Sequence, residues 1–125
     1  MQGPVGKPAI PVAARLTDQH VNALTRLAFV YLSCSQHSSA EDILIGLNSA
    51  APGNEVVVRL LVYAYWRSQQ LTRCRDQINF YLKSWPESKA APTIGLIAEY
   101  VDAAGGGDPS RLQDVLKQWS NRFNS

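Results

Sequence analysis

The sequence has few residues of the kinds that build cross-linked, metal-bound or membrane-embedded proteins. Its 125 residues include two cysteines and one methionine. Cys34 and Cys74 are too few for a disulfide scaffold, and neither has another Cys or a His at metal-ligand spacing. The sequence contains no apolar run of about 18 residues that could span a membrane and no apolar signal-peptide stretch near its start. These absences favour a cytoplasmic protein without a metal or other cofactor.

An excess of charge of one sign is also missing. The 12 basic and 10 acidic side chains leave a net charge of +2, and the basic residues form no run, so we expect no nucleic-acid partner. An apolar share of 46% excludes a disordered polymer. The charged share is only 18%, below the roughly 25% of soluble domains. This deficit predicts a surface that is partly covered by a partner.

The chain repeats itself with a period of 34 residues, the distance between Pro52 and Pro86. Placing residues 21–54 over residues 55–88 aligns apolar with apolar and polar with polar positions. The aligned pairs are Leu24 with Val58, Leu27 with Leu61, Tyr31 with Tyr65, Ala40 with Cys74, Leu44 with Ile78, Leu47 with Tyr81, Gln36 with Gln70 and Asp42 with Asp76. Such self-similarity is typical of stacked structural repeats.

Each repeat predicts two helices separated by a turn. In the first repeat, Leu24, Leu27 and Tyr31 form one apolar stripe, followed by a polar interruption at residues 33–39 and a second stripe at Ala40, Leu44 and Leu47. Helix caps are expected at Thr17 and Asn54. The second helix should end before Pro52, because proline disfavours helical geometry in the residue before it.

A third, degenerate repeat is expected over residues 89–122. A flexible tail is expected at residues 1–16, before the helical domain. The first helix of the third repeat should start near Ser88, with Pro92 in the early turns. The third repeat matches the other two only when its register is shifted by one residue, which places Leu96 and Tyr100 on the core stripe. The glycines at 105–107 predict a flexible break, followed by a cap at Asp108 and a first-turn proline at Pro109. Residues 17–125 are therefore predicted to form one all-helical domain of three antiparallel helix pairs.

The period and its residue types resemble the tetratricopeptide repeat family. The matching residues are Leu24, Leu27, Ala28, Tyr31, Ala40, Leu44, Leu47 and Pro52 in the first repeat and Val58, Leu61, Val62, Tyr65, Cys74, Ile78, Tyr81 and Pro86 in the second. The family's usual Trp is replaced by Leu24 and Val58, and Val62 is bulkier than expected. The resemblance implies an all-α, short right-handed solenoid whose inner face binds protein partners. The alternative fold is an unrelated bundle of six helices.

The positions of that inner face are unusually apolar and aromatic here. Carried over from the family, the predicted partner-binding groove consists of Phe29, Leu32, Arg59, Tyr63, Trp66, Arg67, Ile94 and Val101. Aromatic and arginine side chains are common interface anchors, and apolar anchors suit an amphipathic helix laid in a groove. An extended peptide is the alternative ligand. An alternative is that these residues pack on the chain's own tail or last helix.

The sequence shows no set of titratable residues at the spacing of a catalytic site, so we do not expect an enzyme. His20 and His37 are predicted to be exposed, His37 in a turn. Cys74 occupies a small core position, and Cys34 has no evident His partner. The glycines at 105–107 lack the preceding strand and the following Lys-Ser/Thr of a phosphate-binding loop.

Size, repeat number and groove character together resemble the small cytoplasmic chaperones of bacterial type III secretion. The resemblance implies a chaperone that holds an aggregation-prone amphipathic segment of a secretion component until export, in a heterodimer or heterotrimer. The acidic-peptide clamp of other tetratricopeptide proteins is absent, because its Lys and Asn positions hold Thr25 and Phe29. Two alternatives stay open: an adaptor subunit of another bacterial complex, and a self-associating repeat module that forms a homodimer.

Overall fold

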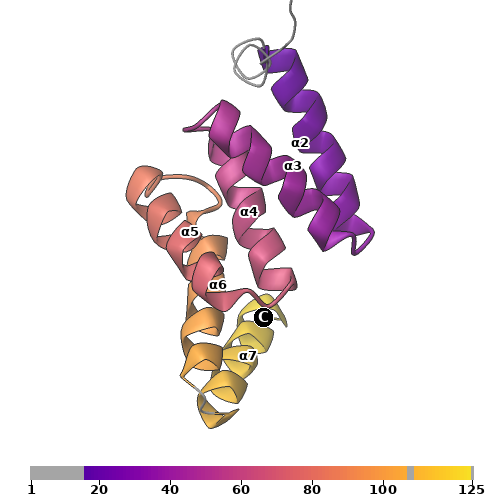
Figure 1. Ribbon diagram of the computed structural model, residues 1–125. Coiled ribbons are helices and arrows are strands. Elements are labelled where there is room, and N and C mark those ends of the chain that lie inside the picture. The colour runs from indigo at the N-terminus through magenta and orange to yellow at the C-terminus, as the bar shows by residue number, and fades with distance from the viewer. Residues whose placement is uncertain (1–15, 107–108, 125) are drawn as a thin grey trace, which may run out of the picture. The chain divides into compact units, whose positions relative to one another are not determined.

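Every regular secondary-structure element in the described part of the chain is an α-helix. A computed structural model describes residues 16–106 and 109–124, which contain turns and six α-helices (Figure 1). They are α2 (Asp18–Ser33), α3 (His37–Ala50), α4 (Glu55–Arg67), α5 (Leu71–Ser84), α6 (Ala91–Gly105) and α7 (Pro109–Asn124). The all-α prediction is confirmed. Residues 1–15 of the predicted tail at residues 1–16, the glycine at 107 and the cap at Asp108 lie outside the described residues.

The chain divides into two compact units whose boundary falls within α4. The first unit ends at Ala64 and the second begins at Tyr65. In the first unit α2 packs against α3, and in the second unit α6 packs against both α5 and α7. Helices that are adjacent in sequence therefore pack together inside each unit, and α6 is covered from two sides.

The 34-residue period is visible in the backbone as well as in the sequence. Both α3 and α5 have 14 residues, and each follows a residue in the left-handed region, Ser35 before α3 and Gln69 before α5, both with φ 61°. The Gln36 amide donates to the Tyr31 carbonyl at 2.7 Å, and the Gln70 amide donates to the Tyr65 carbonyl at 2.8 Å. The two turns thus share one hydrogen-bonding pattern.

The second helix of each repeat buries the residues that the alignment pairs. Ala40, Leu44 and Leu47 are buried in α3, and their counterparts Cys74, Ile78 and Tyr81 are buried in α5. Their four-then-three spacing places them on one face of a helix, which is the face that packs inward. The predicted core of these two helices is confirmed.

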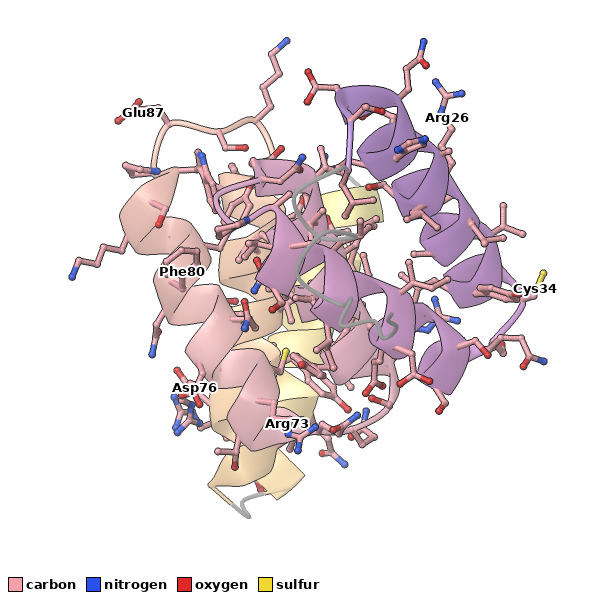
Figure 2. The ribbon with its side chains drawn as sticks, turned by 45° about the horizontal axis from the view of Figure 1, so that its top comes forward. Arg26, Cys34, Arg73, Asp76, Phe80 and Glu87 are labelled. Atoms are coloured by element: carbon pink, nitrogen blue, oxygen red, sulfur yellow. The ribbon has the colours of Figure 1, made fainter. Side chains whose placement is uncertain are left out.

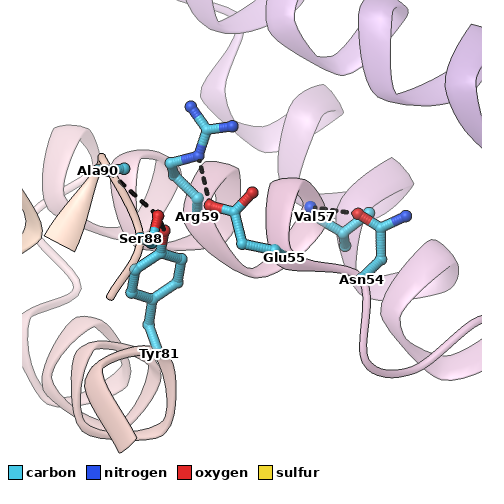
Figure 3. A network of polar contacts seen from close by, with 7 residues as sticks. All are labelled: Asn54, Glu55, Val57, Arg59, Tyr81, Ser88 and Ala90. Atoms are coloured by element: carbon cyan, nitrogen blue, oxygen red, sulfur yellow. Dashed lines mark hydrogen bonds and ion pairs between the residues drawn. The ribbon is translucent and has the colours of Figure 1, made fainter. Parts of the chain in front are cut away.

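The predicted caps at the starts of α2 and α4 are confirmed. The Thr17 hydroxyl accepts the His20 amide N–H at 3.2 Å, and the His20 Nδ1 accepts the Thr17 amide N–H at 3.3 Å. The Asn54 Oδ1 accepts the Val57 amide N–H at 3.2 Å (Figure 3). Each cap satisfies an amide that has no partner within the helix.

The turn between α2 and α3 is shorter than the sequence predicts. α3 begins at His37, because the left-handed Ser35 reverses the chain within three residues. Ser38 and Ser39 therefore lie in the first turn of α3. His37 is half-buried rather than exposed, and its buried Nε2 makes no hydrogen bond to the described residues.

The first helix of the third repeat begins at Ala91, three residues later than predicted. Before it, the Ser88 hydroxyl lies 2.7 Å from the Tyr81 hydroxyl and accepts the Ala90 amide N–H at 3.1 Å (Figure 3). These bonds hold Ser88 in the turn, outside the helix. Pro92 lies in the first turn of α6, and α7 begins at Pro109, as predicted.

The predicted core stripe is correct for α4 but not for α2. Val58, Leu61 and Tyr65 of α4 are all buried. Their counterparts in α2 are not: Leu27 is 41% exposed, and the buried residues of α2 are Val21, Ala28 and Leu32. Burial requires neighbouring elements on that side, and no helix precedes α2 within the described residues.

Candidate partner-binding surface

One stripe of α4 remains accessible while the rest of the helix is buried. The buried residues are Val57, Val58, Leu60, Leu61, Val62, Ala64 and Tyr65. The partly or fully exposed ones are Glu55, Val56, Arg59, Tyr63, Trp66 and Arg67. At 100° per residue the exposed set falls on one side of the helix. We call Val56, Arg59, Tyr63, Trp66 and Arg67 the α4 stripe.

The N-terminal part of the α4 stripe is fixed by an ion pair. Arg59 Nε lies 3.0 Å from Glu55 Oε2, with the side chains 30% and 27% exposed (Figure 3). The two residues are four apart on the helix, and Glu55 lies in its first turn. A pair of this kind contributes only a few tenths of a kcal/mol, roughly 0.3–0.5. Its main effect is to orient a guanidinium beside the apolar residues of the stripe.

The C-terminal part of the α4 stripe carries an aromatic contact. The Trp66 ring meets the Tyr100 ring of α6 edge to face, with centroids 6.0 Å apart and planes at 75°. Both rings are half-buried, so each keeps part of its surface accessible. The T-shaped geometry is the favoured one for aromatic pairs and limits the rotamers of Trp66.

Tyr100 is half-buried, whereas the repeat pattern places it in the core. The repeat alignment makes it the counterpart of the buried Tyr65, whereas it is half-buried and contacts Trp66. The sequence signal that could have revealed the position of Tyr100 is the poor match of the third repeat to the other two. A shifted register moves each position of α6 to a different face of the helix.

Three of the predicted groove residues belong to the core. Ile94 and Val101 are buried on α6, which is covered by both α5 and α7. Leu32 is buried on the same side of α2 as Ala28. These three side chains are therefore not available to a partner in this structure.

The other predicted groove residues are accessible. Arg59, Tyr63, Trp66 and Arg67 lie on the α4 stripe, and Phe29 of α2 is 58% exposed. A phenylalanine so exposed loses the stabilisation of burial, on the order of 1.5–3 kcal/mol.

The histidines and cysteines named as possible catalytic groups lie apart from one another. His20 caps α2, and Cys34 is exposed at its end. Cys74 is buried, and burial raises the pKa of its thiol to about 12, which disfavours the reactive thiolate. Within residues 16–106 and 109–124, no group of three His, Cys, Asp or Glu side chains is arranged to hold a metal ion.

Comparison with known proteins identifies no relative. No family model, no curated protein and no solved structure matches the chain. None of the helices in the described ranges combines the length and apolar character needed to cross a membrane.

Proposed function

We propose that this protein is a bacterial chaperone that binds an aggregation-prone amphipathic helix of a type III secretion component before export. The observation that carries the proposal is the α4 stripe, where Tyr63 and Trp66 stay partly accessible on a helix whose other side is buried. The 34-residue repeat supports it, because repeat proteins bind partners along surfaces of this kind.

The α4 stripe has the dimensions of a helical binding site. From Val56 to Arg67 it extends for about 16 Å, which equals about three turns of a partner helix. Arg59 and Arg67 lie towards its two ends, with the two aromatic residues between them. The client's apolar side covers Tyr63 and Trp66, and acidic groups beside that side pair with the arginines.

The architecture in this proposal follows the tetratricopeptide resemblance. The three helix pairs stack as a short solenoid, and the first helix of each pair contributes to the inner face. Burying the client's apolar side prevents its aggregation, because exposed apolar helices associate with one another. The client dissociates when the export machinery takes it up.

The test measures the affinity for a co-expressed client, chosen among the proteins encoded beside this gene. Tyr63→Ala and Trp66→Ala should each weaken binding by about 1–3 kcal/mol, roughly 5- to 150-fold in Kd, if the rings are anchors. Titration calorimetry gives the affinity, and circular dichroism verifies that each variant is folded.

Phe80→Ala is the matched control. Phe80 is an exposed aromatic residue of α5 (Figure 2). It is not part of the α4 stripe, and its ring contacts the Trp85 ring edge to face. Its removal should leave the client affinity unchanged. Folded Tyr63→Ala and Trp66→Ala variants with native affinity would disprove the proposed site. A client from an unrelated complex would favour the adaptor role instead.

A further inference from the structure

The C-terminal end of the α4 stripe is extended by a residue from another helix. Tyr100 of α6 contacts Trp66 edge to face, and both side chains are half-buried. Arg67 follows Trp66 as the last residue of α4 and is exposed. Tryptophan, tyrosine and arginine are the residue types most enriched among those that dominate the binding energy of protein interfaces. We call Trp66, Arg67 and Tyr100 the end subsite.

The two arginines of the α4 stripe differ in their charged surroundings. Arg59 Nε lies 3.0 Å from Glu55 Oε2, so a carboxylate already offsets its charge. Arg67 forms no ion pair with any residue that the structure describes. On α6, Glu99 is exposed, and Asp102 pairs with an arginine of α5 at 2.9 Å. The charge of Arg67 is therefore less compensated than that of Arg59, and an acidic partner group complements it better.

The aromatic pair offers a pre-formed apolar contact next to this charge. Contact with Tyr100 restricts the rotamers of Trp66, so ordering the ring costs less entropy on binding than it would for an isolated exposed ring. α6 packs against both α5 and α7, which holds the backbone of Tyr100 in place within its unit. A large apolar side chain that packs on the two rings removes further apolar surface from water.

We infer that the end subsite sets the register of the client helix by binding one large apolar and one acidic side chain. The client is the helix of the proposed function, on which this inference rests. Its apolar side chain packs on Trp66 and Tyr100, and its carboxylate pairs with Arg67. Residues three or four apart lie on the same side of a helix, so the client has Glu or Asp at that distance from a large apolar residue.

The test uses two labelled synthetic peptides as probes. Both are capped, alanine-based amphipathic helices of about 18 residues with leucines along one side, a length at which such peptides are helical in water. One has glutamates four residues to either side of its central leucine, and the other has lysines there. Either orientation on α4 then presents one of these charges to Arg67. Fluorescence anisotropy gives the Kd at low ionic strength, because salt screens exposed ion pairs.

The native chain should bind the glutamate peptide about three- to fivefold more tightly than the lysine peptide, as expected for an exposed ion pair. Arg67→Gln should remove most of this preference, whereas Arg59→Gln should leave most of it. Arg26→Gln is the matched control for net charge, because Arg26 is exposed on α2. Tyr100→Ala should weaken both peptides by about fivefold, and Tyr100→Phe, which keeps the ring, should not. Circular dichroism verifies that each variant is folded.

Equal affinities of the native chain for the two peptides would overturn the inference. A preference for glutamate that survives Arg67→Gln, or that Arg26→Gln removes equally, would also overturn it. In these cases the proposed function stands if Trp66→Ala still weakens both peptides. Native affinity in a folded Tyr100→Ala variant would likewise contradict the end subsite.

Two further outcomes would count against the end subsite. Peptide binding that weakens as the protein concentration rises would assign the surface to a second copy of the chain. Failure of both peptides to bind would show that the end subsite does not recognise this pair of side chains. The proposed function is tested separately with the co-expressed client, so the two failures are distinguishable.

Discussion

Small side chains occupy one position in both repeats, at Ala40 and Cys74. Both are completely buried, with 0% exposure, near the start of the second helix of their repeat. A larger residue there would have to displace its neighbours, because protein interiors are close-packed. The sequence predicts this position correctly, since the 34-residue alignment places a small residue in each repeat. Because this position is buried, Cys74 is a packing residue with a weakly acidic thiol.

The first prediction concerns the pH dependence that Cys74 gives to stability. Burial raises the pKa of this thiol from 9.0 to about 12 in the folded chain. Above pH 9 the unfolded chain loses this proton while the folded chain keeps it, so rising pH favours unfolding. The contribution of the thiol is complete below pH 9 and is lost between about pH 9 and pH 12.

Cys74→Ala isolates this effect, because Ala is the residue at the equivalent position 40. At pH 7 the substitution should cost about 1 kcal/mol for the lost volume. Urea unfolding at pH 7 and pH 10.5 should show the native chain losing more stability than the variant. The difference between the unfolding free energies of the two proteins should change by no more than about 1.4 kcal/mol per pH unit. Equal losses in both proteins would mean that the folded chain ionises the thiol normally.

At the scale of the element, the turns are the part that residue patterns describe least well. The alternation of apolar residues predicts the existence and type of each helix, and the caps at Thr17 and Asn54 follow from residue type. The left-handed residues Ser35 and Gln69 carry no such signal, because neither is the glycine that this conformation favours. As a result, the predicted start of α3 is too late.

The second prediction is that glycine at either turn stabilises the chain. A left-handed conformation costs an ordinary residue about 1–2 kcal/mol, and glycine avoids this cost. Glycine also loses more conformational entropy on folding, so the net gain in stability is smaller. Ser35→Gly should therefore raise the free energy of unfolding by up to about 1 kcal/mol. Gln69→Gly should gain less, because Gln69 Nε2 donates to the Trp66 carbonyl at 3.1 Å.

Urea unfolding of both variants tests this prediction against Ser49→Gly. Ser49 is exposed in the last turn of α3, where glycine should destabilise the helix by up to about 0.5 kcal/mol relative to serine. Opposite signs for Ser35→Gly and Ser49→Gly would support strain at the turn. Destabilisation by both would contradict it.

At the scale of the whole molecule, the sequence identifies the surface residues of α4 better than those of other helices. Arg59, Tyr63 and Trp66 follow from the repeat positions, because the side of α4 that the repeat assigns to the core, with Val58, Leu61 and Tyr65, is buried. Leu32 and Ile94 were assigned to the same groove by position alone, but their burial depends on which helices pack beside them. Periodicity gives the face of a helix but not its neighbours.

The third repeat shows the same limit. α6 ends at Gly105 and α7 begins at Pro109, each four residues later than the 34-residue period from α4 and α5 would place it. The period therefore predicts that two further helices exist, but it does not fix which of their residues are exposed.

The most direct test of the central claim, that this chain binds an amphipathic helical client, is light scattering on the purified protein alone and co-expressed with its genomic neighbours. Our account predicts a defined 1:1 or 1:1:1 complex with one small neighbour, lost or weakened in Trp66→Ala and retained in Phe80→Ala. A tight homodimer that binds none of these neighbours would contradict the chaperone function and favour a self-associating repeat module.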